Sequence, residues 1–126
     1  LRNRNFNYLY NFFSKYNDLF ILPSKNKLVK NVWLAFPFLI KSKKFNRNEL
    51  QIFLEKNNIQ TRTIFSGNIL KQPGYKKEYF KINKSGYKNS DYVMDNGILL
   101  GSHQSMTIKE LKSITSTIEK FIKIKI

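Results

Sequence analysis

The sequence predicts a single α+β domain in which a first helix is followed by a short sheet with helices covering one of its faces. Three observations carry this prediction. The length of 126 residues suits one domain. Apolar residues recur at helical spacing near both ends, and short apolar or β-branched runs lie between them. A hydrophobic content of 41%, with 15% aromatic residues, suffices for a packed core and excludes a disordered basic tail.

The first predicted element is an amphipathic helix over residues 2–16, whose apolar residues recur at steps of three and four. A polar connection over 24–31 follows it. The apolar run over 32–40 then predicts a buried strand, in which Pro37 indicates an edge or a bulge because proline cannot donate to a ladder.

Two capping boxes, each followed by an apolar helical stripe, predict the starts of two further helices. The first box, at residues 46–49, begins a helix that should end at Asn57 or Asn58, because asparagine tolerates the left-handed conformation. The second box, at residues 107–110, begins the last helix of the chain.

Weaker signals lie between these two helices. Residues 59–65 alternate β-branched and polar side chains, which predicts a strand. The stretch 66–88 carries three glycines and a proline and is predicted to be irregular. Residues 90–97 predict a short helix with an acidic first turn and a glycine stop, and residues 98–100 predict a short strand.

The formal charge of +15 at pH 7 invites a nucleic-acid-binding interpretation, but the residue types argue against it. The chain has 19 Lys and only 4 Arg, and Lys, Asn and Ile together supply 48 of the 126 residues. Those three amino acids have A/T-rich codons, so the composition is typical of an A/T-biased genome. Because base and phosphate recognition favour the forked guanidinium of arginine, we do not expect nucleic acid as a partner.

The composition excludes several kinds of site. The chain has no cysteine, which excludes thiolate metal ligands and cysteine nucleophiles, and His103 is its only histidine, so no metal site is expected. The longest apolar stretch is about half of what spans a bilayer, so we expect no membrane partner and a cytoplasmic location. Leu1, in place of an initiator methionine, leads us to expect a piece of a longer protein.

No complete catalytic constellation is visible, so we expect no catalytic residue in this chain. Two segments nevertheless suit ligand binding. One strand places Arg62 ahead of Ser66, Gly67 and Asn68, where a glycine lets the backbone approach another group closely. The other segment presents His103 between a strand end and a helix start, where ligand groups are often held. Exposed side chains in plain turns are the alternative for both segments.

These segments resemble the DegT/DnrJ/StrS family of pyridoxal-phosphate-dependent sugar aminotransferases. Residues 59–75 are similar to the stretch G-I-x-T-R-x-x-F-x-G-N-x-x-x-Q-P-x-Y, and residues 33–37 to W-F-G-F-P. Residues 45–50 are similar to F-x-R-x-E-L, and residues 99–107 to L-x-x-H-x-G-M-T. The resemblance covers nearly the whole chain and is strongest toward the sugar-nucleotide 3-dehydratases that make 3,6-dideoxyhexoses.

Two residues depart from the family pattern. Ser105 stands where the family usually has glycine, so we expect strain or a rearranged turn there. Asn58 replaces a glycine just before the strand over 59–65, which is a milder change because asparagine tolerates the left-handed region.

The resemblance implies the small C-terminal α+β domain of a fold-type I enzyme, with a short, mainly antiparallel sheet that has helices on one face. Residues 1–22 would be the connecting helix and residues 23–126 the domain, and the large cofactor-binding domain would be absent. That large domain would make most of the contacts to the cofactor, which would be pyridoxal 5'-phosphate or pyridoxamine 5'-phosphate. The intact enzyme would be a homodimer acting on a sugar nucleotide, with a reductase as a further partner, and the fragment alone would be inactive. By the same resemblance, the substrate-binding residues would be Arg62, Ser66, Gly67, Asn68 and His103.

Three functions stay open at this point. The resemblance favours a 4-keto-6-deoxyhexose 3-dehydratase for sugars of the lipopolysaccharide O-antigen or other polysaccharides. A sugar-nucleotide aminotransferase of the same family differs by keeping a cofactor-binding lysine, which the dehydratases replace by histidine. A small basic nucleic-acid-binding module that uses the lysines and exposed tyrosines is the alternative from another class.

Overall fold

The computed structural model describes residues 1–26, 28–75 and 82–126, and four α-helices and four strands lie within these ranges. The helices are α1 (Arg2–Phe13), α2 (Arg47–Lys56), α3 (Lys88–Asn96) and α4 (Ile108–Lys125). The strands are β1 (Phe20–Ile21), β2 (Ala35–Ile40), β3 (Thr61–Arg62) and β4 (Gly97–Gly101). Short 3₁₀ turns lie at Ser14–Tyr16, Ile69–Lys71 and Pro73–Tyr75.

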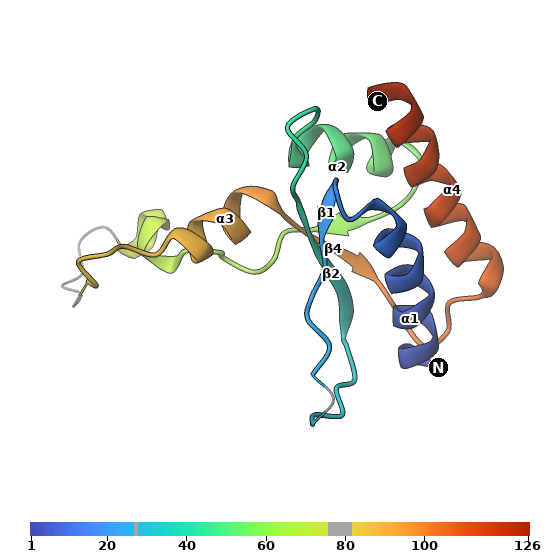
Figure 1. The fold of residues 1–126 in the computed structure, drawn as a ribbon, viewed down its shortest axis with the longest axis horizontal. Helices are drawn as coiled ribbons and strands as arrows, with labels where there is room; N and C mark the ends of the chain where they lie inside the picture. Colours follow the sequence, from blue (N-terminus) through green and yellow to red (C-terminus); the bar gives the residue numbers. More distant parts are fainter. Residues whose placement is uncertain (27, 76–81) are drawn as a thin grey trace.

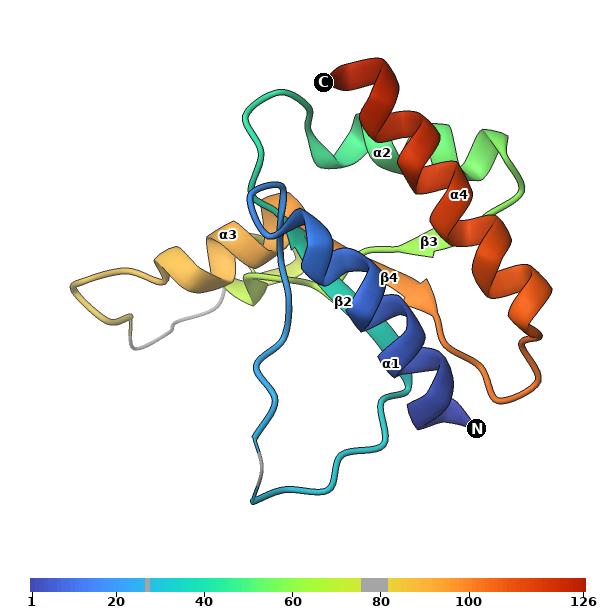
Figure 2. The ribbon, with the colours of Figure 1, turned by 45° about the vertical axis from the view of Figure 1, so that its right-hand side comes forward.

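The strands form one sheet in the order β1-β2-β4-β3, and every neighbouring pair is antiparallel. Helices α1, α2 and α4 cover one face of this sheet, which confirms the predicted α+β class (Figures 1 and 2). Helix α3 lies on the opposite side and, with the segment before it, reaches away from the body of the domain (Figure 1).

Alternation along the two inner strands explains why the helices lie on one face. Phe36, Phe38 and Ile40 of β2 are buried, whereas the residues between them are only half-buried. Ile98 and Leu100 of β4 are fully buried beside them. Because successive strand side chains point to opposite faces, the buried set lies against the helices and the other set forms an open face.

Phe13, from α1, lies in the middle of the core. Its ring centroid lies 4.5 Å from that of Phe38, 5.0 Å from that of Phe20 and 5.1 Å from that of Phe36. One helix and two strands therefore meet at a single aromatic cluster, and burying each such ring is worth about 1.5 to 3 kcal/mol. The segment 1–22, expected as a connecting helix, thus also contributes β1 and part of the core.

Both predicted capping boxes are present. The Asn46 side chain accepts from the amide of Glu49, and the Glu49 side chain accepts from the amide of Asn46, at the start of α2. Thr107 and Glu110 make the same reciprocal pair at the start of α4. Asn58 has φ of 59°, so the left-handed conformation predicted after α2 is confirmed at this residue.

Three strand predictions need correction. β2 begins at Ala35 rather than at residue 32, and β3 holds only two residues of the predicted 59–65 because the chain turns directly after Arg62. β1 was not predicted, since two residues are too short to show a pattern. β2 is an inner strand and not an edge strand. β1 pairs only with residues 39 and 40, however, so at Pro37 this side of β2 has no neighbouring strand, as expected for a proline.

The remaining segments differ in detail. α3 begins two residues earlier than predicted, and the polar stretch before it contains two 3₁₀ turns. Gly97 ends α3 in an extended conformation instead of a left-handed stop, with φ of −83°. It must be glycine because an added Cβ would lie 2.5 Å from the Val93 carbonyl oxygen. Parts of two predicted loops, residue 27 and residues 76–81, lie outside the described residues.

Candidate functional site

The orientation of Arg62 is determined by its neighbour in β3. Thr61 is buried on the helix side, where its amide donates to Glu55 Oε1 at 2.6 Å and its hydroxyl contacts the Gln51 side chain at 3.0 Å. Because strand residues alternate, Arg62 projects from the open face and is exposed. Within the described residues its guanidinium has no hydrogen-bond or ion-pair partner, so it is available to an anionic group.

Arg62 lies in a row of open-face residues that crosses the sheet. It pairs with Leu99 of β4, which in turn pairs with Pro37 of β2. Beyond Pro37, apolar side chains that include Ile21 and Ile64 line a shallow cavity of about 190 Å³. Arg62 does not line this cavity and is exposed to solvent, so it lies outside the apolar part of the open face.

The turn after Arg62 is anchored to α3 by a glycine contact. Gly67 has φ of 61°, and a Cβ added there would lie 2.3 Å from the Cβ of Met94. Its amide donates to the Ile64 carbonyl at 3.2 Å, and the Ser66 carbonyl accepts from the side chain of Gln72 at 2.8 Å. Ser66 itself is exposed. Glycine at position 67 is thus required both by the backbone conformation and by the close approach of α3.

Asn68 is engaged within the chain. Its side chain is 7% exposed, its Nδ2 donates to Asp91 Oδ1 at 2.7 Å, and its Oδ1 accepts from the Leu70 amide at 3.1 Å. Asp91 also forms an ion pair with Lys71 at 2.9 Å. The hydrogen bond from Asn68, followed by that from Lys71, lowers the pKa of Asp91 from its ordinary value. In this structure Asn68 therefore fixes the turn to α3 and presents no free amide to a ligand.

His103 lies in an exposed turn after β4. Its Nδ1 accepts from the amide of Ser105 at 3.2 Å, and its backbone carbonyl accepts from the buried side chain of Asn5. Among the described residues, only Asn58 and Phe65 combine a side chain with positive φ, so the strain expected at Ser105 is absent. Serine is tolerated there because its backbone conformation does not require glycine.

The structure brings four of the five predicted site residues together and leaves the fifth apart. Arg62 pairs with Leu99 in the middle of β4, and the 63–68 turn follows it toward the Gly97 end, whereas His103 follows the other end. β4 alone, from Gly97 to Gly101, separates these two ends by about 13 Å. One small ligand group therefore cannot contact His103 and the 66–68 turn of this chain simultaneously.

Sequence reasoning missed three residues that build this region. Asp91 fastens Asn68 across a separation of 23 residues, which no local pattern shows. Phe65 has φ of 46° and an exposed fraction of 85%, so an aromatic side chain is displayed at a strained position. Arg47 donates from Nη1 to the Met94 carbonyl, linking the start of α2 to the end of α3.

Four carboxylates, those of Glu49, Glu55, Asp91 and Glu110, hold parts of the fold together through hydrogen bonds. The pKa of Glu55 is lowered mainly by the backbone and side-chain hydrogen bonds from Thr61, with a smaller electrostatic contribution from Arg62. Hydrogen bonds from Thr107 lower the pKa of Glu110. Within the described ranges no group of three His, Asp or Glu side chains could hold a metal ion, and no described helix is long and apolar enough to cross a membrane.

Comparison with known proteins gives the same family over almost the whole chain. A family model described as the DegT/DnrJ/EryC1/StrS aminotransferase family matches residues 1–119. The lipopolysaccharide biosynthesis protein RfbH of Salmonella typhimurium is 28% identical over 95% of this chain. The dTDP-4-dehydro-2,6-dideoxy-D-glucose 3-dehydratase of Saccharopolyspora spinosa is 31% identical over 71% of it.

A solved structure supports the fold. The GDP-4-keto-6-deoxy-D-mannose-3-dehydratase of Escherichia coli, with bound hydrated PLP, superimposes with a TM-score of 0.80 over 93% of this chain at 24% identity. The chain spans only 30% of that structure, 28% of the Salmonella protein and 20% of the Saccharopolyspora enzyme. The predicted fold, that of the small domain of a fold-type I enzyme, is therefore confirmed.

Proposed function

Because this chain belongs to the DegT/DnrJ/EryC1/StrS aminotransferase family, we propose that it is the small C-terminal domain of a larger enzyme acting on sugar nucleotides. In this proposal residues 1–22 lead from a large cofactor-binding domain into residues 23–126. The observation that carries it is the guanidinium of Arg62, which makes no hydrogen bond or ion pair within the described residues and lies on the open face just before the turn that the family motif shares.

The proposed reaction is 3-dehydration of a 4-keto-6-deoxyhexose carried by a nucleotide, for sugars of lipopolysaccharide or another polysaccharide. The names of the matched relatives support this choice, since they are a 3-dehydratase and a lipopolysaccharide biosynthesis protein. The alternative is a sugar-nucleotide aminotransferase, because the family as a whole is named for that activity.

This chain contributes binding and positioning in the proposal. Arg62 would pair with an anionic group of the substrate, for which the forked guanidinium is suited. The contact of Gly67 with α3 and the hydrogen bond of Asn68 to Asp91 would hold the turn next to Arg62 in one conformation. His103, which follows the opposite end of β4 from that turn, would contact a different part of the ligand or of the homodimer.

The residues of this chain do not fit the cofactor as its sole holders. Pyridoxal phosphate needs a cradle for its phosphate and a carboxylate for its ring nitrogen. Glu49, Glu55, Asp91 and Glu110 are all committed to hydrogen bonds within the fold. In this proposal the remainder of the parent protein holds most of the cofactor, which is pyridoxal or pyridoxamine 5'-phosphate. A homodimer and a reductase complete the proposal.

The test uses the full-length parent protein with a 4-keto-6-deoxyhexose nucleotide and glutamate, and analyses the sugar product by NMR. A product that has lost its 3-hydroxyl without gaining nitrogen is expected. A product that carries a new amino group would select the aminotransferase alternative. Binding of neither the cofactor nor the sugar nucleotide by the parent would contradict both forms of the proposal.

A further inference from the structure

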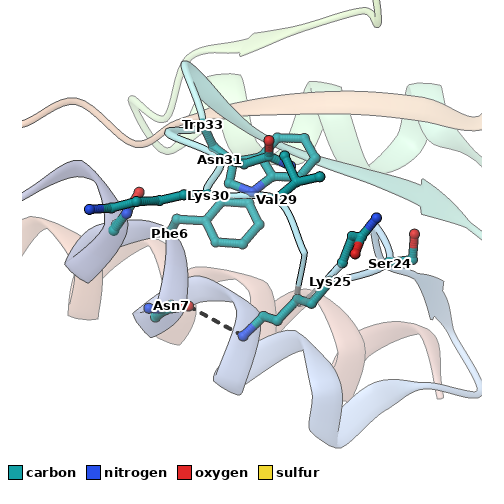
Figure 3. A pocket seen from close by; sticks show the side chains of 10 residues that line it. Phe6, Asn7, Ser24, Lys25, Val29, Lys30, Asn31 and Trp33 are labelled. Carbon is teal, nitrogen blue, oxygen red and sulfur yellow. Dashed lines mark hydrogen bonds between the residues drawn. The ribbon is translucent and has the colours of Figure 1, made fainter.

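A pocket of about 230 Å³ opens between α1 and the segment that leads from β1 to β2 (Figure 3). It is separate from the turn of Arg62, because no residue of β3 or of the 63–68 turn lines it. Its described lining combines lysine and asparagine side chains with an aromatic and aliphatic wall, and it contains no acidic residue.

The aromatic wall is rigid. Trp33 stacks on Phe6 with ring centroids 5.0 Å apart and an angle of 5° between the ring planes. Phe6 is only 3% exposed and also contacts Phe36 of β2, so the core holds the surface on which the indole rests. Trp33 is partly exposed, and within the described residues its ring nitrogen has no hydrogen-bond partner. A flat apolar surface with a spare donor therefore faces the pocket.

The cationic side is partly preorganised. The Nζ of Lys25 lies 3.2 Å from Asn7 Oδ1 and 3.9 Å from the centroid of the Tyr10 ring, so α1 holds this ammonium in place (Figure 3). Lys30 lines the same pocket and has no partner within the described part of the chain. With two ammonium groups and no carboxylate, the pocket favours an anion.

We propose that this pocket binds an organic phosphate, with the phosphate between Lys25 and Lys30 and the attached ring packed on Trp33. Stacking on an aromatic side chain suits both a nucleobase and the apolar face of a sugar. The volume is below the roughly 300 Å³ at which sites for larger ligands begin, so a monophosphate fits better than a complete sugar nucleotide. This inference rests on the pocket alone and does not depend on the proposed function.

The test uses the intrinsic fluorescence of Trp33, the only tryptophan of the 126-residue chain. The chain is titrated at physiological salt with glucose 1-phosphate, thymidine monophosphate, inorganic phosphate and glucose. A saturable change is expected with at least one organic phosphate, and weaker or no binding with inorganic phosphate and glucose. The stronger of the two organic ligands identifies the ring as a sugar or a base.

Matched variants separate a built site from general attraction to lysine. Lys25→Gln and Lys30→Gln should each weaken binding about tenfold, the usual loss for one charge-assisted hydrogen bond. Lys120→Gln removes the same charge from an exposed position on α4, which does not line the pocket, and should leave affinity within about twofold. Trp33→Phe should weaken the binding of organic phosphates and leave the affinity for inorganic phosphate unchanged, and calorimetry measures both because this variant has no tryptophan.

Three results would overturn the inference. One is the absence of saturable binding by either organic phosphate up to about 10 mM, which is weaker than any specific small-ligand site of this kind. Another is an equal loss of affinity in Lys120→Gln and Lys25→Gln, which would assign the binding to overall charge. The last is unchanged affinity in both Lys25→Gln and Lys30→Gln.

Discussion

The exposure of Arg62 is a consequence of how its neighbour Thr61 is held. The hydrogen bonds of Thr61 to α2 fix its side chain on the helix side of the sheet. Because strand residues alternate, the Arg62 side chain then points to the open face. That face carries Leu99 beside Arg62, and among the described residues the guanidinium makes no hydrogen bond or ion pair, only an electrostatic interaction with Glu55. β3 is the edge strand, so a ligand can reach the guanidinium from its outer side.

We therefore predict that Arg62→Ala in the full-length parent lowers kcat/KM about ten- to hundredfold. The reason is the loss of a charge-assisted contact, which typically costs about 1.5 to 3 kcal/mol. Arg62→Lys should not restore activity, because an ammonium lacks the forked pair of donors. Steady-state kinetics measure the effect, and thermal stability should stay unchanged. Activity within about twofold of wild type in both variants would remove Arg62 from the site.

Gly67 offers a second prediction at the residue scale. Gly67→Ala should destabilise the domain by about 2 to 4 kcal/mol, because it adds the cost of positive φ to an overlap with Met94. Gly86→Ala carries only the φ cost, with φ of 72° and open space around it, and Gly74→Ala carries neither. Urea unfolding of the three variants should rank them in that order. Equal stability of Gly67→Ala and Gly74→Ala would show that α3 does not contact the turn.

The candidate site could be predicted from sequence only in part, and the reason differs by residue. Arg62 and His103 are exposed, as the alternative of exposed side chains in plain turns also requires, so their binding role stays a prediction. Asn68 was expected to face the substrate, and its role stays a prediction, because its present partner Asp91 comes from a helix 23 residues away. Such a pairing depends on how the chain folds back, which a local motif does not encode.

At the scale of elements, a helix or strand was predicted accurately where the residues that determine it lie close together in the sequence. Both capping boxes lie within four residues, and the starts of the two helices were predicted to the residue. β1 has two residues and exists because they pair with residues 39 and 40 of β2, a long-range event without a local pattern. The end of β3 at Arg62 likewise reflects the turn that Gly67 makes against α3.

The elements are also joined by carboxylates, which gives a prediction about pH. Lys125 bonds Glu49, linking α4 to α2, and Thr61 bonds Glu55, linking β3 to α2. Hydrogen bonds to these carboxylates lower the pKa of both groups. A lowered folded-state pKa stabilises the domain above the ordinary glutamate pKa, and this contribution is lost as the pH falls through the folded value. Stability should therefore fall progressively below about pH 5.

The measurement is urea unfolding between neutral and acid pH, with Glu55→Gln as the test variant. This variant should lose stability at neutral pH and show a shallower fall at acid pH, because one titrating group has been removed. Asp18→Asn is the control, since Asp18 is exposed and makes no hydrogen bond within the described residues. Identical acid profiles for wild type and Glu55→Gln would contradict the role given to the bond between Glu55 and Thr61.

At the scale of the whole molecule, the net positive charge suggests nucleic-acid binding, whereas the fold suggests an enzyme domain. The positions of the four arginines favour the enzyme domain. Three of the four are engaged within the fold: Arg2 with Gln104, Arg4 with the Met106 carbonyl, and Arg47 with the Met94 carbonyl. Arg62 is the one arginine without a hydrogen bond or ion pair in the part of the chain that the structure describes, and it has only an electrostatic interaction with Glu55. Sequence-specific base recognition relies on several forked donors directed at one groove, and this chain does not assemble them.

The net charge of +15 should therefore produce weak, sequence-independent binding of nucleic acid by the 126-residue chain. At physiological salt we expect a dissociation constant of roughly 10⁻⁴ to 10⁻⁶ M, the range of purely electrostatic association, and a steep loss of affinity as salt rises. Filter binding with duplex DNA and single-stranded RNA of several sequences measures both quantities. Lys120→Gln and Lys56→Gln, which remove exposed charges from different helices, should weaken binding slightly and equally, because no single lysine is part of a defined groove. Sub-micromolar affinity for one sequence that persists at high salt would require base contacts that the described residues do not offer, and would favour the nucleic-acid-binding alternative over the enzyme domain.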